Sequence, residues 1–226
     1  MVIALLAIAF LAVAILPQVW VGWTIRRHGV ARQDLPGTGG ELARHLLNRF
    51  GLTHVKVEIT DKGDHYDPDN KAVRLLKQHH DGRSLSAVAI AAHEVGHAIQ
   101  DGRDERALQT RQSLARLAAQ TDRIAFWFFL AAPVLGILAR TPLAFAAVVG
   151  LGVALLGVRV LVNLITLPVE FDASFRKALP ILKEGRYLGE RDMPAIRGLL
   201  MAAALTYVAG ALISMVNLAR WISLLR

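Results

Sequence analysis

Residues 85–100 read LSAVAIAAHEVGHAIQ, a run of small and apolar residues that recur with helical spacing. Ser84 or Ser86 is suited to cap the start of this predicted helix, and Gly102 lies just past its end. The run also contains two histidines and a glutamate, which are costly to bury among apolar side chains unless something binds them. The segment therefore predicts a helix built around a polar site.

His93 and His97 are four residues apart, so one face of a helix would present both imidazoles to a single metal ion. Glu94 would lie about 100° further round the helix, where its carboxylate reaches a metal-bound water and not the metal. Zinc lowers the pKa of such a water toward roughly 7, and a carboxylate can accept its proton during attack on a peptide carbonyl. The spacing predicts one Zn²⁺ per chain and a zinc metallopeptidase with Glu94 as catalytic base. The alternative is a metal-containing membrane scaffold or adaptor without catalytic activity.

A catalytic zinc ion usually has three protein ligands, and the motif supplies only two. Arg103 stands where a metzincin would have its third histidine, so that class is excluded. Glu170 is the favoured third ligand because it ends a long apolar segment on the same predicted side of the membrane as the motif. The alternative is that Glu170 is a solvated border residue. The other candidates are Asp101, Asp104, His65, His79, His80 and Asp172, of which His79 and His80 lie in a polar loop and are expected to be solvated.

Further polar residues are candidates to orient the ligands or the substrate. Asp172 is suited to accept a hydrogen bond from the N–H of a ligand imidazole, and Ser174 is a weaker candidate for that role. His65 and Tyr66 lie in a turn-rich stretch. They could help to hold the oxyanion of the transition state, or they could serve only the turn.

Four segments avoid charge for long stretches in a chain that is 54% hydrophobic. They are residues 2–25, 124–139, 141–158, which continues past Arg159 to residue 169, and 198–219. An α-helix needs about 20 apolar residues to cross a bilayer core of roughly 30 Å. The sequence therefore predicts a mainly α-helical membrane protein, with about four transmembrane helices and a cytosolic, zincin-like helix-hairpin-helix segment.

The placement of the basic residues decides how the net charge of +8 is interpreted. Most of them lie in residues 26–123 and 176–197, whereas the connection between the second and third spans and the C-terminal tail hold few. The positive-inside rule then predicts that both basic stretches, and with them the active site, are cytosolic. We expect these basic residues to face the anionic lipids of a bilayer, and nucleic acid is not an expected partner. The chain has no cysteine, which excludes disulfides and thiolate ligands.

The predicted domain organisation follows from the spans. It comprises a transmembrane anchor (1–25), a cytosolic catalytic segment (26–123) with the HExxH helix (85–100), a transmembrane hairpin (124–169), a cytosolic segment with the third ligand (170–197), and a transmembrane helix with a short tail (198–226). Within the catalytic segment, apolar residues have helical spacing over 41–50 and alternate over 55–59, and residues 72–76 can return as a second strand. We expect the two strands to form a hairpin in which 72–76 is an edge strand that could align a substrate backbone.

Three stretches together resemble the signature segments of the bacterial membrane-bound neutral zinc metallopeptidase family. They are residues 63–68 (GDHYDP), 91–100 (AAHEVGHAIQ) and 168–174 (PVEFDAS). The order of the elements is similar over nearly the whole chain. The resemblance implies zinc on both histidines of the motif, with its glutamate as the base, in a protein of the bacterial inner membrane. The leading hypothesis is an endopeptidase that hydrolyses membrane or membrane-proximal proteins, with protein or peptide substrates and the lipid bilayer as its partners.

A more distant resemblance is to the heat-shock and CAAX-processing membrane endopeptidases. In these proteins the HExxH motif precedes a pair of spans, and a glutamate follows them in a Glu-aromatic-x-Ala-Asp context. Residues 170–174 (EFDAS) are similar to that context, except that Ser174 replaces the final Asp. This departure weakens the transfer of an orienting role to residue 174, but not the assignment of Glu170 as a ligand.

Overall fold

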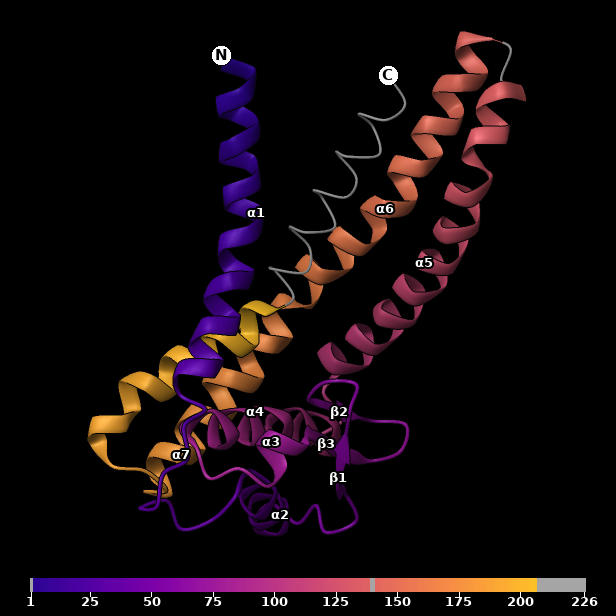
Figure 1. The fold of residues 1–226 in the computed structure, drawn as a ribbon. Coiled ribbons are helices and arrows are strands. Elements are labelled where there is room, and N and C mark those ends of the chain that lie inside the picture. The colour runs from indigo at the N-terminus through magenta and orange to yellow at the C-terminus, as the bar shows by residue number, and fades with distance from the viewer. Residues whose placement is uncertain (1, 139–140, 207–226) are drawn as a thin grey trace. The chain divides into compact units, whose positions relative to one another are not determined.

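The computed structural model describes residues 2–138 and 141–206 of the chain (Figure 1). These residues belong to two compact units. One unit, here called the core unit, comprises Val19–Gln109 and Pro168–Thr206, and the other takes in the described parts of residues 2–18 and 110–167. The main cluster of buried apolar side chains lies in the core unit, which also contains the HExxH segment.

Helix α4 (Leu85–Gly102) is the central element of the core unit. Residues 85–100 are all buried, which suits a helix that is apolar on nearly every side. Helix α2 (Gly39–Arg49), two of the three strands and the π-helix η1 (Asp172–Ala178) pack against α4. Ser84 is the N-cap, and its hydroxyl accepts a hydrogen bond from the backbone N–H of Ala87 at 3.1 Å. The predicted helix is confirmed, and Ser84 is its cap.

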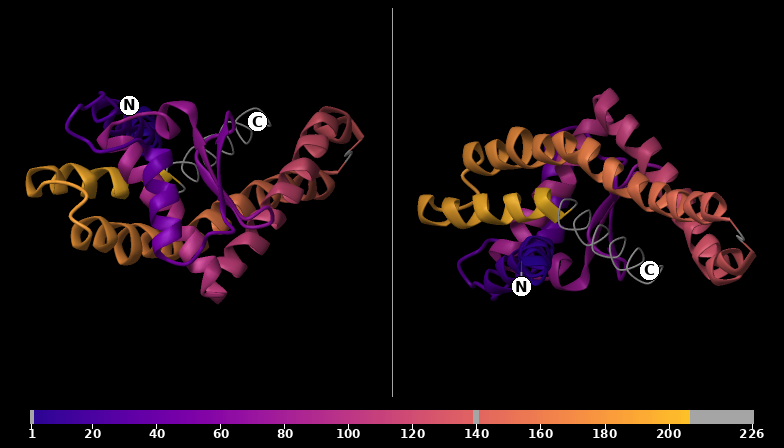
Figure 2. Two further views of the ribbon diagram at one scale, coloured as in Figure 1. Left: turned by 90° about the horizontal axis from the view of Figure 1, so that it is seen from below. Right: turned by 90° about the horizontal axis from the view of Figure 1, so that it is seen from above.

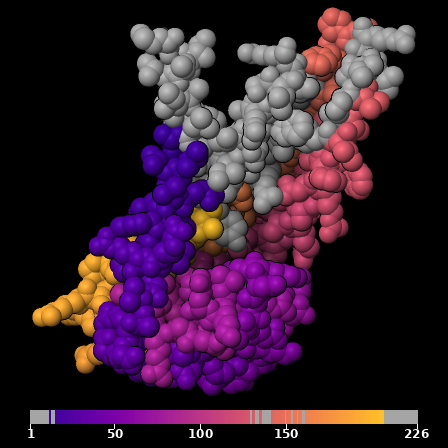
Figure 3. Space-filling model, in the orientation of Figure 1, coloured from indigo at the N-terminus to yellow at the C-terminus, as the bar shows by residue number. Residues whose placement is uncertain are grey.

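Three short strands form a small sheet beside α4, which Figures 1 and 2 show from three directions. Strand β3 (Ala72–Leu76) lies between β1 (Lys56–Thr60) and β2 (His65–Asp67). A single helical turn, α3 (Lys77–His80), follows β3 directly. Figure 3 shows one face of the molecule as a space-filling surface, on which the N-terminal half of the core unit appears in indigo to magenta.

The predicted hairpin of 55–59 with 72–76 is wrong, because β1 and β3 are parallel, with Lys56 opposite Ala72. The turn-rich stretch between them contributes β2, which pairs antiparallel with β3 and leaves β1 to pair on the other side. Gly63 has a φ of 97°, which favours glycine, and it allows the chain to turn before β2. β3 is therefore the central strand and not the predicted edge strand, since its backbone is paired on both sides.

Three longer helices correspond to predicted spans: α1 (Val2–Arg27), α5 (Arg106–Leu138) and α6 (Pro142–Phe171). No helix within the described ranges combines the length and the apolar character that crossing a membrane requires. The prediction of about four transmembrane helices, and of a multi-pass arrangement built on them, is therefore corrected. A crossing needs about 20 apolar residues. Charged residues occupy α5 as far as Arg123, and Arg159 interrupts the apolar run of α6.

The chain continues from α6 without a break into the π-helix η1 (Asp172–Ala178) and then α7 (Leu179–Glu184). A 3₁₀ turn, η2 (Glu190–Asp192), leads into a helix over residues 193–206. The fourth predicted span, residues 198–219, begins in this helix, and its remainder lies outside the described residues. The π-helix follows the candidate ligand Glu170 directly and packs along α4.

Candidate metal centre

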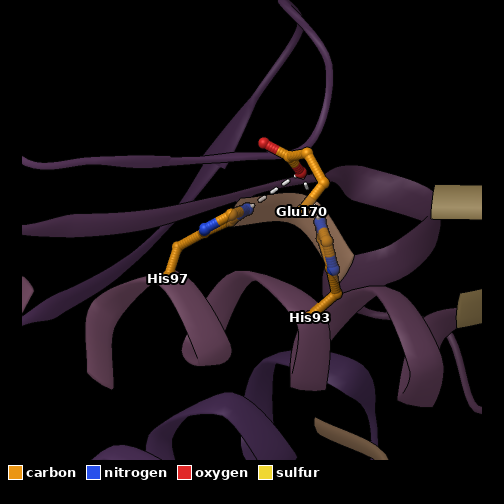
Figure 4. A group of neighbouring side chains, drawn as sticks. All are labelled: His93, His97 and Glu170. Carbon is orange, nitrogen blue, oxygen red and sulfur yellow. Dashed lines mark hydrogen bonds and ion pairs between the residues drawn. The ribbon is translucent and has the colours of Figure 1, made fainter. Parts of the chain in front are cut away.

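Two imidazoles and one carboxylate converge inside the core unit. His93 and His97 lie one turn apart on α4, and their rings meet edge to face with centroids 4.8 Å apart. Glu170, near the end of α6, points between them (Figure 4). Its Oε2 atom lies 3.3 Å from Nε2 of His93 and 3.2 Å from Nε2 of His97. All three side chains are buried, and Glu170 has no exposed surface.

The spacing of these atoms fits a zinc ion. One donor atom from each residue lies within 4.8 Å of the other two. Zinc ligands at roughly 2.0–2.1 Å in tetrahedral geometry lie about 3.3–3.4 Å from one another. The distances of 3.2 and 3.3 Å from the Glu170 oxygen to the imidazole nitrogens agree with that value. Two histidines and a glutamate are also a ligand set of catalytic zinc sites, in which the fourth position is left for water.

Ser174 fixes the tautomer of the neutral His93 imidazole. Its hydroxyl donates a hydrogen bond to the backbone carbonyl of Leu200 at 3.1 Å. The same oxygen lies 2.9 Å from Nδ1 of His93, and it can only accept there because its hydrogen is already used. His93 therefore carries its hydrogen on Nδ1, so that Nε2 presents a lone pair toward Glu170.

Gln100 fixes the tautomer of the neutral His97 imidazole in the same way. Its amide nitrogen donates to the carbonyl of Val169 at 3.1 Å and to Oδ2 of Asp172 at 2.7 Å. The amide oxygen therefore faces Nδ1 of His97, at 2.8 Å, and accepts its N–H. Nε2 of His97 is left with a lone pair.

With both imidazoles neutral, as metal ligands are, the two Nε2 lone pairs and the Glu170 oxygen thus point at one buried place. Three electron-rich atoms at such distances repel one another, and a bound cation removes that repulsion. Imidazole ligands of zinc have this arrangement, with the N–H of the other ring nitrogen donated to an oxygen acceptor. The protein's own hydrogen bonds therefore prepare the site for a metal ion.

Asp172 has a different place from the one predicted for it. It was expected to accept the N–H of a ligand imidazole, but Gln100 and Ser174 are the acceptors, and Asp172 binds the Gln100 amide instead. Burial alone would raise the pKa of the Asp172 carboxyl. Hydrogen bonds from Lys177 and Gln100, and the positive charge of Lys177, hold that pKa below its usual value. Asp172 is therefore an anion that orients Gln100.

The strand residues His65 and Tyr66 make local contacts. The Tyr66 hydroxyl donates to Oδ2 of Asp101, at the end of α4, at 2.6 Å. Burial and the neighbouring Asp101 carboxylate raise the pKa of Tyr66. Nδ1 of His65 lies 2.8 Å from the carbonyl oxygen of Gly63. Glu94 is buried on α4 beside His93, with 6% of its surface exposed.

Three of the other residues considered as third ligands, Asp101, His79 and His80, have partners elsewhere. Asp101 binds Tyr66, and His80 lies 2.6 Å from Oδ1 of Asp81. His79 was expected to be solvated, but it is buried with 5% exposure. Its Nδ1 lies 2.8 Å from Oδ2 of Asp64, whose Oδ1 accepts a hydrogen bond from the backbone N–H of Leu76, just before α3.

Gln100 and Lys177 were not among the predicted site residues. Gln100 is three residues after His97, so the spacing of an α-helix already places the two on one face. That signal was present in the sequence. Lys177 is seven residues after Glu170, and its approach to Asp172 depends on the π-helix, which has no signal of comparable strength in the sequence.

The site defines a protein of the zinc metallopeptidase type, and comparisons with known proteins agree. A family model described as "putative neutral zinc metallopeptidase" matches residues 3–226. The chain is 36% identical over 225 residues to the "putative membrane protease YugP" of Bacillus subtilis (strain 168). The match covers 98% of this chain and 96% of that protein. No solved structure matches the chain. The chain belongs to this neutral zinc metallopeptidase family, and His93, His97 and Glu170 are its candidate zinc triad.

Proposed function

We propose that the protein is a zinc metalloendopeptidase that hydrolyses peptide bonds in membrane or membrane-proximal proteins. One observation carries the proposal: three donor atoms from His93, His97 and Glu170 converge on one buried place, and the buried Glu94 follows His93 directly on α4. The Bacillus subtilis relative carries the name "putative membrane protease YugP", which supports a peptidase that acts at a membrane.

Each residue of the site has its own role in the proposed hydrolysis. Zinc bound by the triad would polarise the scissile carbonyl and lower the pKa of a water molecule. Glu94 would act as the base: it would accept a proton from the attacking water while the water oxygen bonds to the carbonyl carbon, and would then deliver that proton to the amide nitrogen as the C–N bond breaks. Ser174 and Gln100 keep the hydrogens of both imidazoles on Nδ1, so Nε2 of each remains available to the metal.

An extended substrate could bind by adding to a sheet edge. Because β3 is paired on both sides, we assign this role to the outer edge of β2. β2 packs against α4, which carries the motif, whereas β1 packs against α2. The proposed edge strand is therefore His65–Asp67.

The test is peptide-bond cleavage by the purified full-length chain. An unfolded protein such as a casein serves as substrate, and mass spectrometry identifies new termini. We expect cleavage that a chelator abolishes and zinc restores. A protein that holds one zinc ion per chain and cleaves none of a broad set of soluble and membrane-derived peptides would instead support the alternative, a metal-containing scaffold or adaptor.

A further inference from the structure

A buried lysine lies at the far end of a chain of hydrogen bonds that leads to His97. Lys177 is 7% exposed. Its Nζ contacts Oδ2 of Asp172 and lies 3.0 Å from Oε1 of Glu105. A buried ammonium group is costly unless it is paired, and these two carboxylates supply the pairing. The lysine is therefore held in one place between η1 and the segment that follows α4.

The π-helix brings Lys177 to Asp172. The two residues are five apart, and both lie in η1. In a π-helix the hydrogen bonds join residues five apart, so such residues lie above one another. In an α-helix they would point about 140° apart round the axis. The widened turn after Glu170 is thus what allows the lysine to reach the aspartate.

Asp172 in turn fixes the orientation of Gln100. The Oδ2 atom of Asp172 accepts from Lys177 and also, at 2.7 Å, from the Gln100 amide nitrogen. The second N–H of that amide has the carbonyl of Val169 as its acceptor, at 3.1 Å. If the amide turned over, its oxygen would face both of these acceptors, and His97 would meet an N–H instead of an oxygen.

We propose that Gln100 is a positioning residue of the zinc site, and that Lys177 acts through Asp172 to hold it. The hydrogen bonds that run from Lys177 through Asp172 and Gln100 to His97 are here called the relay. The relay keeps the hydrogen of His97 on Nδ1 and its Nε2 lone pair directed at the metal. This inference rests on the zinc-binding part of the proposed function, and its readout is zinc affinity, which does not depend on peptidase activity. A failure of the peptidase proposal would therefore leave it testable.

The sharpest test exchanges the hydrogen-bond donor and the acceptor between residues 100 and 172. Gln100→Glu replaces two N–H donors by a carboxylate that faces the Val169 carbonyl and Asp172, and the repulsion from both turns the side chain away from His97, whose N–H then loses its acceptor. Loss of an outer hydrogen-bond partner typically lowers metal affinity about 10–100-fold, and we expect a fall of that order. Adding Asp172→Asn supplies an amide donor to Glu at position 100, so the double variant should recover a large part of the loss.

Zinc affinity is measured on the metal-free full-length chain by competition with a chromophoric chelator. The melting temperature of each metal-free variant and the visible spectrum of its cobalt(II) form are recorded beside it. We expect the Gln100→Glu variant to have an altered cobalt spectrum and the double variant to return toward the unmodified one. Unchanged affinity in Gln100→Glu, or no recovery in the double variant, would overturn the positioning role.

Lys177→Met tests the far end of the relay, and Lys183→Met is its matched control because Lys183 is an exposed lysine on α7. We expect Lys177→Met to weaken zinc binding several-fold or more and Lys183→Met to leave it unchanged. If Lys177→Met lowers only the melting temperature and keeps full zinc affinity, the lysine is merely structural and its part in the relay is refuted.

Discussion

Gly96 packs against the backbone of Ala173 so closely that a Cβ atom at residue 96 would lie 2.7 Å from the Ala173 carbonyl oxygen. Gly96 lies between the two ligand histidines on α4, and Ala173 lies in η1, three residues after Glu170. The contact therefore sets how near the carboxylate can come to both imidazoles. It also explains why a glycine, which is unfavourable in a helix interior, stands inside the motif.

Gly96→Ala should separate α4 from η1. The added methyl group meets a backbone atom, which cannot move aside as a side chain can, so we expect a loss of about 1–3 kcal/mol in the free energy of unfolding. Zinc affinity should fall with it. Gly198→Ala is the control, because nothing lies within 4 Å of a Cβ at that helical position and the substitution should leave zinc binding intact. Denaturant unfolding and chelator competition give the two values, and a Gly96→Ala protein as stable as Gly198→Ala would refute the close-packing argument.

Removal of the third ligand should empty the site. Glu170→Ala and Glu170→Gln both lack the carboxylate, and Gln keeps the shape of the side chain. We expect well under one zinc ion per chain in both variants after dialysis, as measured by elemental analysis. Glu184→Gln, at the exposed end of α7, should retain the metal. Full zinc content in both Glu170 variants would assign the third ligand elsewhere.

Ser174→Ala should weaken zinc binding without abolishing it. The change leaves the N–H of His93 and the carbonyl of Leu200 without their shared partner. Outer partners of this kind typically contribute about 10–100-fold to metal affinity. Isothermal titration or chelator competition would measure the loss. An affinity equal to that of the unmodified protein would show that Ser174 does not orient the ligand.

Asp67 should make the stability of the core unit depend on pH. Burial would raise the pKa of its carboxyl, but hydrogen bonds from Asn70 and the charge of Arg74 hold it below its usual value. A carboxyl with a lower pKa in the folded protein stabilises the fold above the unfolded pKa of about 3.9, and this contribution disappears as the pH falls through the folded value.

Asp67→Asn should therefore cost stability near neutral pH, by about 1.5 kcal/mol for lost hydrogen bonds to a charged group. Its disadvantage should begin to shrink as the pH falls below about 4 and should go on shrinking as the pH falls through the lower pKa of the folded carboxyl, because protonation removes the charge that Asn lacks. Urea unfolding of the zinc-free protein at pH 7 and pH 3 tests this. An equal difference at both pH values would contradict it.

The parts of the site that a single helix encodes could be predicted from the sequence. The helical spacing of the motif placed His93 and His97 on one face, and Ser84 marked where the helix begins. Glu170 was predicted as a third ligand from its position at the end of an apolar segment, and in the structure it lies between the two imidazoles.

The pairing of the strands, the character of the long helices and the π-helix could not be predicted from the sequence. Alternation of apolar residues identifies a strand but not its partner, so the parallel pairing of β1 with β3 could not be seen. Hydropathy favoured membrane spans that the described helices do not support. The π-helix changes which residues share a face, and it therefore hid the approach of Lys177 to Asp172.

The most direct test measures zinc content and peptide cleavage on the same preparations of the unmodified chain and Glu94→Gln. Glu94 is the proposed base and not a ligand, so both proteins should hold one zinc ion per chain, and only the unmodified protein should cleave its substrate. Cleavage by Glu94→Gln at the unmodified rate would contradict the proposed mechanism, and a zinc-free unmodified protein that still cleaves would contradict the metal centre itself.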